Sequence, residues 1–91
     1  MRSDLTARRQ RIDEIDLRLV QLLHERAEVV LEIADCKRRG RMDIVDKARE
    51  EVVLRRASAR SKGPFPPEAI GRVFRSILRE SRLLQKRVME R

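Results

Sequence analysis

The first 39 residues contain neither glycine nor proline, and this unbroken stretch limits what the chain can fold into. Ser3 or Asp4 can cap the start of a helix, and Gly40 stands where helices commonly end in a left-handed residue. A helix over residues 4–39 would be about 54 Å long. That is longer than a compact chain of this size is wide, since its radius of gyration would be about 12 Å.

The same stretch carries an apolar repeat of seven residues, which is typical of a coiled-coil seam. Its two columns consist of Leu5, Ile12, Leu19, Arg26 and Ile33, and of Ile15, Leu22, Val29 and Cys36. Two further helices of about 20 residues each cannot cover a seam of this length. The excess length therefore needs a second chain, and the pattern predicts a helical dimer.

Glycine and proline residues divide the remainder into two shorter segments. A second helix is expected over residues 43–61, because Asp43 provides a capping-box-like start and Gly63 follows the end. A third is expected over residues 67–89, with Pro67 in its first turn. We therefore predict an all-α fold in a single domain, with three helices per chain, one of them very long, in an intertwined homodimer.

Composition excludes several classes of protein. A single cysteine, Cys36, and a single histidine, His24, leave neither an internal disulfide nor a credible metal site within one chain. No run of about 18 apolar residues is present, so a membrane span is not expected. The charged N-terminal segment lacks the apolar core of a signal peptide, and a cytoplasmic location is expected.

The net charge of +8 leaves a second class of function open. A basic helical chain can bind nucleic acid through phosphate contacts or act as a scaffold. However, the sequence has no Trp or Tyr and only two Phe for base stacking. We expect no nucleic-acid partner, and the positive charge equally suits an anionic small molecule.

Polar side chains interrupt the apolar stripes of all three expected helices. They are Arg26 in the first, Asp46, Arg49 and Glu50 in the second, and Ser81 and Gln85 in the third. Arg49 has valines at helical spacing on both sides and is expected to lean toward the core. Burying a polar group without a partner costs roughly 2 to 7 kcal/mol. These groups therefore either satisfy one another, as caps and ion pairs, or line a cavity for a polar ligand.

Cations on the long helix favour the ligand interpretation. Arg26 and Lys37 are 11 residues apart, which places them roughly 20° from a common face and about 16 Å apart along the axis. Arg9 lies about 26 Å before Arg26 and cannot reach the same point from its own chain. It can enter the site of an antiparallel partner. Taken alone, Arg9 is a surface residue and Lys37 a solvated helix end.

From Leu5 to Val88 the chain resembles the all-helical chorismate mutases of the AroQ class. The resemblance is carried by the strings RQRIDEIDLRLVQLLHERAEVVLEIADCK, DIVDKAREEVV and IGRVFRSILRESRLLQ. The residues that match the family's site are Arg9, Arg26, Lys37, Asp46, Arg49, Glu50, Ser81 and Gln85. The first six keep the family's spacing, and one residue fewer precedes the last helix. The full set is highly specific, whereas any single member is weak.

The resemblance implies an isomerase that converts chorismate to prephenate in the shikimate pathway, toward Phe and Tyr, without cofactor or metal. The substrate carboxylates would be bound by Arg26, Lys37, Ser81 and the partner subunit's Arg9. Lys37 and Gln85 would donate to the ether oxygen as its bond to carbon breaks.

The resemblance also assigns the carboxylates of the second helix. Glu50, helped by Asp46, would accept from the ring hydroxyl, and Arg49 would brace Glu50 and the anionic end of the ligand. The isochorismate–pyruvate lyases share the fold and are the nearest alternative, but they lack the equivalents of Glu50 and Ser81. The GPFP turn also resembles that of mutase domains fused to a synthase, which leaves open a partner enzyme of the shikimate pathway.

Overall fold

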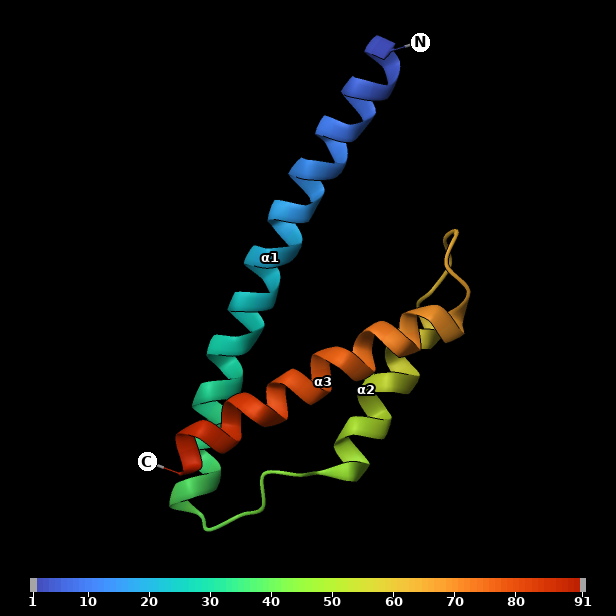
Figure 1. The fold of residues 1–91 in the computed structure, drawn as a ribbon. Coiled ribbons are helices and arrows are strands. Elements are labelled where there is room, and N and C mark those ends of the chain that lie inside the picture. Colours follow the sequence, from blue (N-terminus) through green and yellow to red (C-terminus); the bar gives the residue numbers. More distant parts are fainter. Residues whose placement is uncertain (1, 91) are drawn as a thin grey trace.

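The computed structural model describes residues 2–90, which form an all-α fold. Its helices are α1 (Arg2–Arg39), α2 (Lys47–Ala59) and α3 (Pro67–Met89). The prediction of three helices, one of them very long, is confirmed for these residues. Figure 1 shows α3 returning across the C-terminal half of α1, while the N-terminal half of α1 extends away from the other helices. No helix in this part of the chain is both long and apolar enough to cross a bilayer.

The start of α2 differs from the expected residue 43. The helix begins at Lys47 because Asp46, not Asp43, provides its N-cap. The Asp46 carboxylate accepts a hydrogen bond from the backbone N–H of Arg49 at 3.0 Å, which satisfies a donor that has no partner within the helix. The segment between α1 and α2 is therefore a longer connection than the sequence indicated.

The end of α1 is closed by Arg41 rather than by Gly40. The Gly40 N–H still bonds to the Cys36 carbonyl at 3.0 Å, whereas Arg41 takes the left-handed conformation with φ 54°. The Met42 N–H then bonds to the Lys37 carbonyl at 2.8 Å, which completes a Schellman-type ending. Beyond this turn the connection stays close enough to α1 for the Ile44 carbonyl to accept a hydrogen bond from Lys37 Nζ.

The buried core of the chain is small. α3 packs against both α1 and α2, and the buried apolar side chains are Val30, Ala34 and Leu78. In contrast, every described residue of α1 before Arg26 is exposed. The chain measures 58 × 27 × 14 Å and has a radius of gyration of 16.8 Å, against about 12 Å for a compact chain of this length.

Candidate functional site

Arg26 and Ser81 join α1 to α3. The Arg26 guanidinium donates through Nη1 to Ser81 Oγ at 2.7 Å, and both residues are half-buried. Ser81 Oγ donates its own proton to the Ile77 carbonyl, also at 2.7 Å. The hydroxyl is therefore an acceptor toward Arg26 here, and it must rotate away from Ile77 before it can donate to a ligand, as the family resemblance implies.

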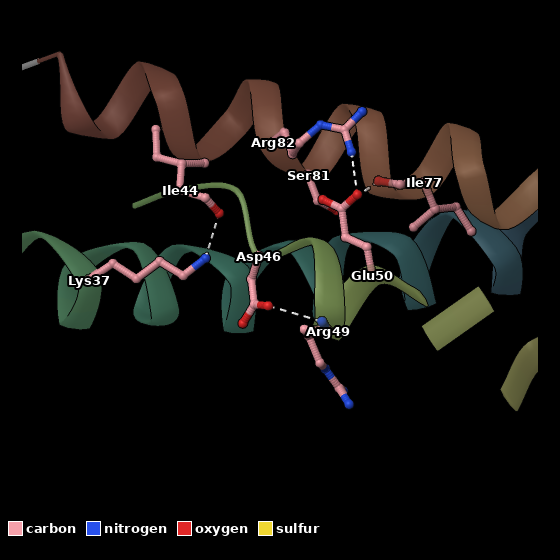
Figure 2. A network of polar contacts seen from close by, with 8 residues as sticks. All are labelled: Lys37, Ile44, Asp46, Arg49, Glu50, Ile77, Ser81 and Arg82. Carbon is pink, nitrogen blue, oxygen red and sulfur yellow. Dashed lines mark hydrogen bonds and ion pairs between the residues drawn. The ribbon is translucent and has the colours of Figure 1, made fainter. Parts of the chain in front are cut away.

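Lys37 and Gln85 form the second connection between these helices. Lys37 Nζ donates to Gln85 Oε1 at 3.2 Å and to the Ile44 carbonyl at 2.7 Å. The connection after α1 supplies that carbonyl, as Figure 2 shows. An ammonium group has three protons, so one remains for a ligand. Gln85 is only 8% exposed, and since its oxygen faces Lys37, its NH₂ group is left to donate.

Glu50 turns toward α3 and binds Arg82. Arg82 Nη1 lies 2.5 Å from Glu50 Oε1, and the exposed fractions of the two side chains are 37% and 21%. In Figure 2 the Glu50 carboxylate points toward Arg82 and Ser81, whereas the Arg49 side chain points away from α3. Arg49 is exposed. The prediction that Arg49 leans toward the core is therefore wrong, whereas its role in bracing Glu50 and the anionic end of a ligand stays a prediction.

The remaining predicted residues, Asp46 and Arg9, take no part in the contacts between α1 and α3. Asp46 is exposed at the cap of α2, where it binds the Arg49 backbone and lies one turn before Glu50. Arg9 is exposed on the projecting half of α1 and has no part in the contacts above. Cys36, a member of the apolar seam, is exposed, with Arg39 Nη2 at 3.7 Å from its sulfur. It lies on the seam that the other helices leave uncovered.

Two open cavities are lined by residues of the predicted site. One, of about 340 Å³, is lined by both Arg26 and Ser81. The other, of about 830 Å³, is lined by Lys37 and Asp46 together with the connection between α1 and α2. Neither cavity contains all the predicted residues. The single chain therefore presents the candidate site in two parts.

Reasoning from the sequence missed two groups in this region. The Ile44 carbonyl becomes an acceptor only through the path of the chain after α1, which no side-chain pattern reveals. Arg82 carried a weak signal, because it stands one turn after the buried Leu78 and so lies beside the apolar stripe of α3. Its pairing with Glu50 joins two residues that are 32 positions apart in the sequence.

The chain is similar to known proteins along nearly all of its length. The chorismate mutase type II family matches residues 8–86. A chorismate mutase from Methanocaldococcus jannaschii is 30% identical over 83 residues, which cover 90% of this chain and 84% of that protein. Form II of the chorismate mutase from Thermus thermophilus superposes with a TM-score of 0.89 and 32% identity, covering 91% of this chain and 94% of the other.

Longer relatives contain a similar segment. The T-protein of Enterobacter agglomerans is 40% identical over 83 residues, which cover 89% of this chain. The bifunctional chorismate mutase/prephenate dehydratase of Neisseria gonorrhoeae is 38% identical over 76 residues, which cover 84% of this chain. This chain spans only 22% and 20% of the lengths of those two proteins. Since the family match and the superposed fold each take in most of the three helices, the chain belongs to the chorismate mutase type II family.

Proposed function

We propose that the chain is a mutase that converts chorismate to prephenate. The observation that carries this proposal is the pair of contacts joining α1 and α3, Arg26 to Ser81 and Lys37 to Gln85. They fix two cations at the helix contact, with unused donors. Arg26 uses one N–H donor of five on Ser81, so its side chain can also bind a carboxylate.

The reaction suits a site that contains donors but no nucleophile. In the rearrangement one C–O bond breaks and one C–C bond forms in a concerted step, and no proton is transferred. The work left to the protein is to hold a flexible dianion in a compact conformation and to stabilise the charge that develops as the bond breaks. Fixed cations and an amide provide both functions.

The developing charge falls on the ether oxygen, and Lys37 and Gln85 are the groups assigned to it. The third proton of Lys37 and the NH₂ group of Gln85 are both uncommitted in the described contacts. Hydrogen bonds that strengthen as this oxygen becomes more negative stabilise the transition state more than the substrate, and so increase the rate. Glu50 would accept from the ring hydroxyl, and Asp46 lies one turn away to assist.

The proposed active form is a homodimer whose long helices pack antiparallel. Exposed apolar side chains on the N-terminal half of α1 support this assembly, among them Leu5, Ile12, Leu19 and Leu22. Light scattering is expected to give about twice the chain mass of 10.8 kDa. In such a dimer the partner subunit's Arg9 would close the divided site. A folded monomer at micromolar concentration would contradict the dimer.

A direct assay tests the proposed reaction. Purified protein should remove the absorbance of chorismate, with prephenate as the product. Release of pyruvate from isochorismate, without turnover of chorismate, would instead support the lyase alternative. Binding to DNA that weakens steeply with salt, with neither activity, would support a nucleic-acid-binding protein.

Gln85→Glu is expected to make activity strongly dependent on pH. An ionised carboxylate repels the developing oxyanion, whereas a protonated carboxyl can donate to it. We expect a loss of about a hundredfold in kcat at neutral pH, with recovery as the pH falls through the titration of the new carboxyl. The control is Gln85→Ala, which should be impaired at every pH. A profile for Gln85→Glu that is as flat as this control would show that Gln85 does not face the ether oxygen.

A further inference from the structure

Glu50 has one defined side-chain partner in the part of the chain that the structure describes, and that partner is Arg82. The contact runs from the first turn of α2 to the C-terminal half of α3, and it uses one carboxylate oxygen, Oε1. Within residues 2–90 no hydrogen bond or ion pair involves the second oxygen of Glu50. We propose that Arg82 is a positioning residue, which orients the Glu50 carboxylate so that its second oxygen accepts the ring hydroxyl of the substrate.

The contact between Arg82 and Glu50 also balances the negative charge of the Glu50 carboxylate. The inference rests on the proposed function, in which a substrate with two carboxylates enters beside Glu50. A carboxylate without a counter-ion would repel that dianion. Arg82 supplies the compensating charge at the first oxygen of the carboxylate, Oε1. The Glu50 carboxylate can then accept a hydrogen bond without opposing substrate binding.

No other cation near Glu50 performs this task among the described residues. Arg49 is its neighbour in sequence, but the Arg49 side chain points away from α3 (Figure 2). Arg79, one turn before Arg82 on α3, is paired instead with Glu80 at 3.8 Å. The geometry therefore distinguishes Arg82 from arginines that lie equally close in sequence or on the same helix.

Exposure indicates that orientation, not stability, is the main effect. Arg82 and Glu50 are 37% and 21% exposed, so water partly screens their attraction. Ion pairs of this kind contribute little to stability. Loss of the pair should therefore shift the melting temperature by less than about 5 °C, while leaving the carboxylate free to rotate.

The test measures chorismate kinetics in four variants. Arg82→Ala should lower kcat/KM by about 10- to 100-fold, which corresponds to the loss of one charge-assisted hydrogen bond. Arg82→Lys should regain most of this loss, because the contact uses a single donor and one positive charge. Arg79→Ala is the matched control and should remain fully active. Arg82→Gln, which keeps a long polar stem, replaces the alanine variant in the test if that variant does not fold.

A double-mutant cycle with Glu50→Gln separates positioning from a general structural role. Glu50→Gln alone should be impaired, and adding Arg82→Ala should cost less than about twofold more, since a neutral amide needs no counter-ion. An equal loss from Arg82→Ala in both backgrounds would overturn the inference. So would full activity of Arg82→Ala, matching Arg79→Ala. If the unmodified chain does not turn over chorismate, the proposed function itself fails, and the role of Arg82 fails with it.

Discussion

Arg26→Leu should reduce chorismate turnover by about a thousandfold and leave the chain as stable as before, or more so. The arginine is a half-buried cation within an apolar column, and it contacts Ser81. Leucine fits that column and removes a charge that is costly to bury. Removing a fixed donor from a developing charge typically costs a factor of about a hundred to a thousand. The measurements are kcat/KM with chorismate and thermal unfolding.

An exposed arginine on the same helix provides the control for this substitution. Arg38 pairs with Asp35 on the surface and has a side chain that is 53% exposed. Arg38→Leu should keep its activity. A fall in the melting temperature of Arg26→Leu that accounts for its lost activity would assign Arg26 to structure rather than to the reaction.

Arg9→Ala and Arg26→Ala proteins should each be inactive, yet regain activity when they are unfolded and refolded together. In the proposed dimer a complete site needs Arg26 from one chain and Arg9 from the other. Random pairing makes half of the dimers mixed, and each mixed dimer contains one intact site of two. The expected recovery is therefore about a quarter of normal activity.

A second mixture controls for recovery by any other route. Arg26→Ala and Lys37→Ala remove two groups that the same chain supplies to its own site. Every site formed in that mixture lacks one of them, so no activity should return. Two results would exclude the role of Arg9 in the partner's site. One is recovery of activity in this control, and the other is no recovery of activity in the first mixture.

The contacts between α1 and α3 show how far the sequence predicts the site. Arg26, Ser81 and Gln85 were identified because each interrupts an apolar stripe, and a polar residue on a buried face requires a partner. The helical period gives the angle of each residue around the helix axis, and the unbroken length of the first helix gives the distance between residues along it. For such residues the pattern and the contacts agree.

Arg49 shows where the same reasoning fails. Its expected orientation assumed a helix that begins at residue 43, but the cap at Asp46 starts the helix at Lys47. Arg49 therefore occupies the first turn, and its side chain points away from α3. A helix boundary depends on a competition between caps, which the residue types alone do not decide. The pairing of Arg82 with Glu50 depends on how α2 and α3 cross, which is a tertiary property.

The uncovered arm of α1 has a consequence for inheritance in the proposed assembly. Residues 2–25 of α1 are exposed in their own chain, so a defect at Arg9 would impair the neighbour's chemistry and not that of the chain which carries it. Two defective alleles, one with its substitution in residues 2–25 and the other with its substitution in the rest of the chain, could then support growth together where neither does so alone.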